Sequence, residues 1–193
     1  NSTYSIKPGD VALVHAAAGG TGNLICQMIL EKGGRVIATT SNDQKEKIIR
    51  ETGVADVIRY DSQSVVEEVK NLTGGKGVDV VYDGVGASTF DDSLASLKPR
   101  SLMVLFGAAS GPVPAFDLQR LNANGSLFIT RPTLAHYLAN RQELEMRMSA
   151  IFKSISDGKL KIRIGREYPL AQAATAHDDL AGRGTVGKLL LNP

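Results

Sequence analysis

The chain has 193 residues, of which 42% are hydrophobic and 22% charged, and its formal net charge is +2. This length and composition suit an ordinary globular protein of one domain, or one domain with part of another, while so small a charge gives no argument for nucleic acid or a membrane surface. No apolar run is long enough to span a bilayer, and the single cysteine, Cys26, excludes an intramolecular disulfide and indicates a reducing compartment, by default the cytoplasm or an organelle matrix.

The first two thirds of the chain alternate between two kinds of pattern. Apolar runs typical of strands occur at residues 11–15, 35–39, 56–60, 78–82, 101–106 and 127–130, and helical patterns lie between them at 23–32, 43–51, 64–73 and 89–97. Continuous apolar strands that alternate with helices predict an α/β fold, a parallel sheet covered on both faces. Six such strands fit the doubly wound Rossmann order 3-2-1-4-5-6, with the ligand outside the carboxyl ends of the strands.

The composition changes after Pro132. An amphipathic helix is predicted over 143–156, with an apolar face made of Leu144, Met148, Ile151, Phe152 and Ile155. A short strand at 161–164, a helix at 172–180 and an apolar tail at 188–192 follow, and they do not extend the strand–helix alternation. We therefore predict a dinucleotide-binding domain over residues 1–135 and a C-terminal appendage of helix and strand over 136–193.

A small-residue loop, Ala-Ala-Ala-Gly-Gly-Thr-Gly at 16–22, joins the first strand to the first helix. A strand, a glycine loop, a helix and a second strand within about thirty residues are the arrangement that binds a dinucleotide pyrophosphate. Glycines let the backbone approach the phosphates, and the unpaired N–H groups of the first helical turn point at them. The alternative is that Gly19, Gly20 and Gly22 only allow tight packing of the helix on the sheet.

The tip of the second strand indicates which dinucleotide is bound. An NAD site usually places Asp or Glu there to hold the ribose 2′-hydroxyl, whereas this chain has Thr-Thr-Ser-Asn at 39–42 and then Lys45. A hydroxyl-rich tip with a nearby ammonium favours a 2′-phosphate, and hence NADPH. The alternative is that Lys45 is a solvated charge beside Lys47, and Asp43 keeps that interpretation open.

Other candidate motifs are weaker evidence for a function. The strand ends at 82–86 and 106–110 contain glycine and lie on the expected ligand edge, although either could be an ordinary turn. The Walker-like run at 182–188 has no Ser or Thr after Lys188 and precedes an apolar run, so we interpret it as a chance match. His15, His136 and His177 are scattered, no Cys/His cluster has metal-ligand spacing, and we assign no metal and no catalytic acid or base.

These motifs together resemble the zinc-independent, zeta-crystallin-like quinone oxidoreductases of the medium-chain dehydrogenase/reductase superfamily. The resemblance rests on residues 15–22, Gln44-Lys45, 82–86, 106–107, 130–134, Tyr168-Pro169-Leu170 and 189–193. It implies pyrophosphate contacts from Thr21 and Gly22 and a 2′-phosphate site at Ser41 and Lys45. It further implies an adenosine flank at Tyr60, a second cation from Arg183, and a nicotinamide side formed by Val85, Phe106, Ala109, Pro132, Thr133 and Leu134.

Two residues depart from the family pattern: Ser41 stands where glycine is common, and Ala109 where serine can occur. The resemblance also implies a β-rich, GroES-like catalytic domain ahead of this sequence, and the chain begins with Asn1 rather than Met. We therefore expect a truncated chain that binds NADPH with little or no quinone turnover. Its apolar tail at 189–191 would then lack a neighbour, which favours association with another chain, and we expect a homo-oligomer, a dimer.

Three functions remain open on the sequence alone. The first is the NADPH-binding part of a quinone oxidoreductase, with a small-molecule quinone as substrate of the intact enzyme. The second is an NADPH-dependent enoyl or 2-alkenal reductase, and the third is a non-catalytic protein that binds NADPH or RNA. The weak net charge and the lack of an aromatic–basic stripe argue against nucleic acid.

Overall fold

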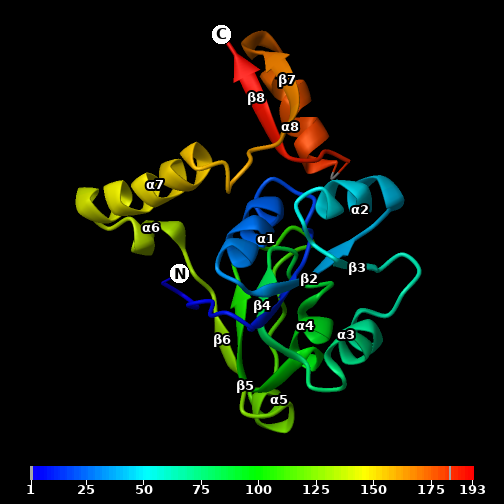
Figure 1. Ribbon diagram of the computed structural model, residues 1–193. Coiled ribbons are helices and arrows are strands. Elements are labelled where there is room, and N and C mark those ends of the chain that lie inside the picture. Colours follow the sequence, from blue (N-terminus) through cyan, green and yellow to red (C-terminus); the bar gives the residue numbers. More distant parts are fainter. Residues whose placement is uncertain (1, 183) are drawn as a thin grey trace.

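The computed structural model describes residues 2–182 and 184–193. Its main feature is a sheet of six parallel strands in the order β3-β2-β1-β4-β5-β6, which confirms the doubly wound order predicted from the sequence (Figure 1). The strands are β1 (Val11–Val14), β2 (Arg35–Thr40), β3 (Asp56–Arg59), β4 (Val78–Asp83), β5 (Leu97–Leu105) and β6 (Phe128–Thr130).

Helices cover both faces of this sheet, because successive residues of a strand point to opposite sides. On one face, Ala12 and Val14 of β1 belong to a cluster with Cys26 of α1 (Gly22–Glu31) and Ile49 of α2 (Asp43–Arg50). On the other face, Leu13 belongs to a cluster with residues of α3 (Val65–Thr73) and α4 (Phe90–Ala95). The central strands are therefore buried on both sides, as the continuous apolar runs predict.

Most predicted elements lie within two residues of the observed ones, and the exceptions have physical causes. β5 begins at Leu97, four residues before the predicted start, and its pairing with β4 shifts register between Val78 and Val80. Two helices were not predicted, α5 (Gln119–Ala123) and α6 (Leu134–Tyr137). Each is too short to show a helical period in the sequence. Among the described residues, no helix combines the length and the apolar character that crossing a membrane requires.

The C-terminal region contains a strand–helix–strand unit with its own sheet. β7 (Ile164–Pro169) and β8 (Lys188–Asn192) are parallel, and η1 (Leu170–Gln172) and α8 (Ala173–Ala181) connect them. In Figure 1 this unit stands above α1 and α2, apart from the six-stranded sheet. The prediction that this region does not extend the strand–helix alternation was wrong, because β7, α8 and β8 repeat that pattern, although in a sheet of their own.

The predicted strand at 161–164 was wrong at both ends, since β7 begins three residues later and ends five residues later. The backbone of Lys161 is bound by a side chain of α1 instead of a strand: its N–H donates to Gln27 Oε1 over 2.7 Å, and its carbonyl accepts from Gln27 Nε2 over 3.0 Å. The amide group of Gln27 thus takes the place of a strand partner, and β7 begins only at Ile164.

The long helix of the C-terminal region, α7 (Arg141–Ser156), begins two residues earlier than predicted because the Asn140 side chain caps it, accepting from the Glu143 N–H. The predicted apolar face is present and only partly covered: Met148, Ile151 and Ile155 are half-buried. Leu144 is 39% exposed and Phe152 59%, and no residue of this fully described helix is buried.

Candidate functional site

The glycine loop joins β1 to α1 through a tight turn. Ala16 adopts a positive φ of 51°, and its carbonyl accepts the Gly19 N–H over 3.0 Å. A Cβ on Gly22 would lie 2.5 Å from that carbonyl oxygen, so only glycine fits at the first position of α1. The close contact at Gly22 is thus with the backbone of the loop itself, at Ala16 and Ala17, and it does not exclude a phosphate site at the same helix end.

Gly20 has a different neighbour. A Cβ at this position would lie 2.7 Å from the carbonyl oxygen of Gly187, just ahead of β8. Gly187 in turn donates its N–H to the Ala18 carbonyl over 3.3 Å, and Gly19 and Gly187 form an isolated parallel bridge. The glycine loop thus packs against the C-terminal region, which composition and periodicity did not reveal.

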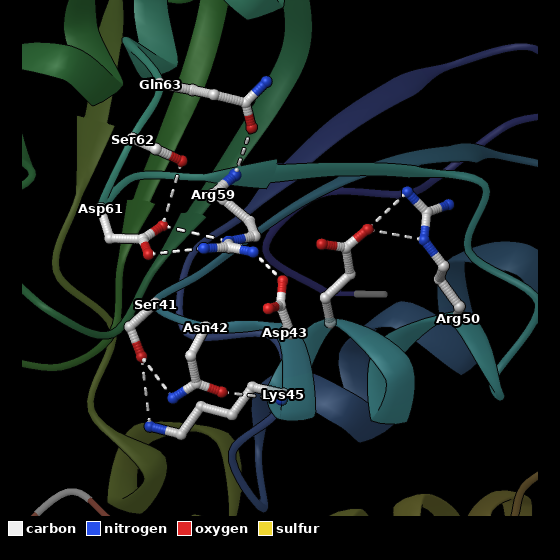
Figure 2. Close-up of polar contacts among 10 residues, drawn as sticks. Ser41, Asn42, Asp43, Lys45, Arg50, Arg59, Asp61, Ser62 and Gln63 are labelled. Atoms are coloured by element: carbon white, nitrogen blue, oxygen red, sulfur yellow. Dashed lines mark hydrogen bonds and ion pairs between the residues drawn. The ribbon is translucent and has the colours of Figure 1, made fainter.

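The tip of β2 continues into α2 through a polar turn (Figure 2). Asn42 caps α2 by accepting the backbone N–H of Lys45 over 2.9 Å. The Lys45 side chain extends back along the tip, where its Nζ lies 3.5 Å from Ser41 Oγ (Figure 2). An ammonium and a hydroxyl are thus held together at the end of the strand, next to the start of a helix.

One guanidinium forms ion pairs with two carboxylates near this tip. Arg59, at the end of β3, forms ion pairs with Asp43 and with Asp61, the latter over 2.8 Å (Figure 2). The hydrogen bonds from Arg59 hold the pKa of the Asp61 carboxyl below its ordinary value and raise the pKa of Arg59 itself. Asp61 is therefore ionised at pH 7, and the Arg59 guanidinium offsets the negative charge of both acids, which weakens the objection that Asp43 would repel an anion.

A groove runs along the carboxyl ends of the strands and brings seven of the predicted residues together. It has a volume of about 240 Å³. The predicted residues that line it are Gly19, Gly20, Ser41, Lys45, Tyr60, Val85 and Ala109. The residues that line it without having been predicted are Ala16, Ala18, Thr40, Leu180, Thr185 and Gly187.

Thr40 is the most informative of the residues that the sequence interpretation did not single out. It is 2% exposed, and its Oγ1 has no hydrogen-bond partner among the described residues. A buried hydroxyl without a partner is costly, and in a groove it indicates a polar ligand. Thr185 and Gly187 come from the C-terminal region, and the only sequence signal for them was the glycine-rich run interpreted as a chance match.

The remaining predicted residues lie outside this groove. Thr21 is exposed at the N-terminus of α1 and its hydroxyl makes no capping bond, whereas Phe106 packs its ring over Gly84. Pro132 and Thr133 precede α6, and Leu134, its first residue, is 71% exposed. The prediction for Arg183 falls outside the described residues.

Asp83 organises the loop that carries Val85. Its carboxylate is fully buried at the end of β4, and Oδ1 accepts the backbone N–H groups of Val85 over 2.8 Å and Gly86 over 3.0 Å. His15, which directly precedes the glycine loop, is also buried and hydrogen-bonded, to Thr39 and Ser93. It is a hydrogen-bonding residue, as the sequence interpretation favoured over a base.

Across the described part of the chain, no group of three or more His, Cys, Asp or Glu side chains is placed to hold a metal ion. His136 lies in α6 and His177 in α8, far along the chain from His15. Burial of Cys26 raises the pKa of its thiol to about 12, so the thiol is protonated at neutral pH and packs as a small apolar group. These residues do not fit a zinc site.

Comparison with known proteins agrees with this geometry. The family described as zinc-binding dehydrogenase matches residues 20–151. The chain is 41% identical to a 2-haloacrylate reductase of Burkholderia sp over 194 residues, covering 100% of this chain and 58% of that protein. It is 44% identical to a quinone oxidoreductase of Salmonella typhimurium, covering 99% of this chain and 59% of that protein.

A solved structure shares the fold over the whole chain. The Escherichia coli quinone oxidoreductase complexed with NADPH superposes with a TM-score of 0.96 at 42% identity, covering 100% of this chain and 60% of that one. The chain thus spans somewhat less than two thirds of the length of the relatives it matches. The chain belongs to the zinc-binding dehydrogenase family.

Proposed function

We propose that this chain binds NADPH in the groove, with the 2′-phosphate held between Ser41 and Lys45. The observation that carries the proposal is the strand tip itself, where an ammonium and a hydroxyl line the groove and the nearby acids are paired with Arg59. A phosphate dianion gains charge-assisted hydrogen bonds there, whereas a ribose hydroxyl would find no carboxylate to accept its proton. The relative solved with NADPH supports the same assignment.

The other parts of the cofactor follow from the direction of the groove. The pyrophosphate would lie at the N-terminus of α1, over the backbone of residues 19–22 and near the Thr21 hydroxyl. The adenosine would lie against Tyr60, with the buried Thr40 hydroxyl available to its ribose. The nicotinamide would reach Val85 and Ala109. By family resemblance alone, we assign further contacts with the nicotinamide to Phe106, Pro132, Thr133 and Leu134, and the second cationic contact to Arg183.

NADPH supplies a hydride, and we propose a quinone as the acceptor in the whole protein. The chain's own residues would bind and orient the cofactor, and none of them is assigned as an acid or base. We assign residues 1–135 to cofactor binding and 136–193 to a region shared with the rest of the protein. Because the chain spans 59% of a quinone oxidoreductase relative, we expect it alone to bind NADPH with little or no quinone turnover.

A second acceptor class is favoured by one comparison. A 2-haloacrylate reductase is 41% identical to this chain over its whole length, and haloacrylates are activated alkenes rather than quinones. The described groove concerns the cofactor, so it does not separate the two acceptors. Steady-state rates of the full-length protein with 1,2-naphthoquinone and with 2-chloroacrylate would separate them, because one acceptor should be preferred in kcat/KM by a factor of ten or more, on the order of the specificity that pocket contacts provide.

The cofactor assignment is tested by calorimetric titration of the chain with NADPH and with NADH. NADPH should bind more tightly, and Lys45→Ala should reduce the ratio of the two affinities by about tenfold, the value of one charge-assisted contact. Lys47→Ala is the matched control, since Lys47 is an exposed lysine of the same helix outside the groove. Equal binding of NADH and NADPH by the unmodified chain would contradict the proposal.

A further inference from the structure

Four polar side chains form a buried network beneath the groove. Thr39 of β2, Asp83 of β4 and Ser93 of α4 are fully buried, and His15 is 2% exposed. Thr39 Oγ1 lies 3.0 Å from His15 Nδ1, His15 Nε2 lies 3.1 Å from Ser93 Oγ, and Ser93 Oγ lies 2.8 Å from Asp83 Oδ2. The network thus crosses the sheet from β2 through the end of β1 to β4, by way of one helix.

The chemistry of the end group fixes the direction of every hydrogen bond. The Asp83 carboxylate can only accept, and both its oxygens are already saturated: Oδ1 accepts two backbone N–H groups, and Oδ2 accepts Thr89 Oγ1 over 2.7 Å as well as Ser93. Ser93 has one hydroxyl hydrogen, and it points to Asp83. The Ser93 oxygen must therefore accept from His15, which places the imidazole hydrogen on Nε2.

The same logic continues to the other end. A neutral imidazole with its hydrogen on Nε2 has an acceptor at Nδ1, so the Thr39 hydroxyl donates to it. Burial lowers the pKa of His15, and the two carboxylates that act on the ring, Asp83 and Asp92, oppose this shift without reversing it. His15 is therefore neutral at pH 7, and the three hydrogen bonds run in one direction: Thr39 donates to His15, His15 to Ser93, and Ser93 to Asp83.

The network touches three separate segments of the groove. Thr39 precedes Thr40, His15 precedes Ala16 with its positive φ, and Asp83 holds the loop of Val85; Thr40, Ala16 and Val85 all line the groove. We propose that Thr39, His15, Ser93 and Asp83 form a hydrogen-bond network, with every bond donated in the same direction, that positions these three segments relative to one another for NADPH. This inference rests on the proposed function. Ser93 is the positioning residue, because the hydrogen-bond network passes through its single hydroxyl group.

The chain offers a matched control for Ser93. Ser96 is a second buried serine next to the same helix, 1% exposed, and its hydroxyl donates to the Asp92 carbonyl within the helix over 2.7 Å. Ser93→Ala and Ser96→Ala each remove one buried hydroxyl, but only the first interrupts the network. We expect Ser93→Ala to weaken NADPH binding by about tenfold and Ser96→Ala to change it by less than about twofold.

The imidazole of His15 gives a readout that a merely structural role would not move. In ¹⁵N-detected spectra of the unmodified chain, assigned with His15→Gln, the Nε2 signal should be that of a protonated nitrogen and the Nδ1 signal that of an unprotonated one. In Ser93→Ala the hydrogen should move to Nδ1 or exchange between the two nitrogens, because the Nε2 acceptor is gone. Thr39→Val, a nearly isosteric change, should leave the hydrogen on Nε2 and weaken NADPH binding.

The outcomes separate the inference from the function on which it rests. An Nδ1–H tautomer in the unmodified chain would overturn the direction of the network, whether or not cofactor binds. Equal losses of NADPH affinity in Ser93→Ala and Ser96→Ala would overturn the positioning role. Failure of the unmodified protein to bind NADPH would overturn the proposed function and the positioning role with it. The imidazole signals would still show in which direction the hydrogen bonds of the network are donated.

Discussion

The six-stranded sheet and the β7–β8 unit are both parallel strand–helix–strand arrangements, yet they bury very different amounts of apolar surface. In the large sheet, Leu13 and Val80 are fully buried from both faces, whereas Tyr168 is the one buried residue of β7, and Leu190 of β8 remains 38% exposed. A two-stranded sheet with one helix has too little area to form a core of its own. The same strand–helix–strand pattern therefore forms its own core in the large sheet but depends on neighbouring residues in the β7–β8 unit.

The largest test of this contrast is a pair of leucine truncations. Leu13→Ala should lower the free energy of unfolding by about 2–5 kcal/mol, because it removes buried methyl groups and leaves a cavity between the sheet and the helices α3 and α4. Leu190→Ala should cost less than about 1 kcal/mol, since its side chain is already partly in water. Urea denaturation monitored by circular dichroism measures both losses of unfolding free energy. Equal losses would show that β8 is as well packed as β1.

A glycine pair sharpens the same contrast at the groove. Gly22→Ala places a Cβ 2.5 Å from the Ala16 carbonyl oxygen, so the loop must shift, and we expect a loss of about 1–3 kcal/mol in stability together with weaker NADPH binding. Gly184→Ala in the C-terminal region meets nothing within 4 Å and should change stability by less than about 0.5 kcal/mol. Thermal denaturation and calorimetry provide the two readouts, and a stable, binding-competent Gly22→Ala would refute the tight-turn argument.

The junction between the regions should respond locally. Gln27→Ala removes both hydrogen bonds to the Lys161 backbone, at about 1 kcal/mol each, while α1 keeps its packing on the sheet. Amide hydrogen exchange should accelerate at Lys161 and in β7 but stay unchanged in β1 and β4. Acceleration throughout the sheet would mean that the two regions unfold together.

The smallest effect concerns pH and one histidine in each region. The lowered pKa of His15 means that the unfolded chain takes up a proton more readily than the folded one, so stability is present above the ordinary histidine pKa of about 6.5 and is lost as the pH falls below it. The urea midpoint should therefore decline from pH 7.5 to pH 5.5. His15→Gln should flatten this decline, and exposed His177→Gln should preserve it; a decline unaffected by His15→Gln would assign it to other groups.

The parts that sequence could predict are those set by local pattern. The strand order followed from six apolar runs, and the grouping of Ser41 with Lys45 followed from a strand end and a helix start only a few residues apart. The contributions of Thr185 and Gly187 to the groove could not be predicted, because they depend on a contact with residues more than 160 positions earlier. The start of β7 was missed for a similar reason, since a distant side chain, that of Gln27, binds the backbone where the strand was expected.

The approach of Gly187 to Gly20 has a consequence for any ligand of the groove. One wall of the groove comes from the strand ends of the six-stranded sheet and another from the C-terminal region, so a molecule that spans Lys45 and Thr185 contacts both. By thermodynamic reciprocity, such a molecule strengthens the association of the two regions by the same factor by which that association strengthens its own binding. Binding of a ligand in the groove and association of the two regions are therefore thermodynamically coupled.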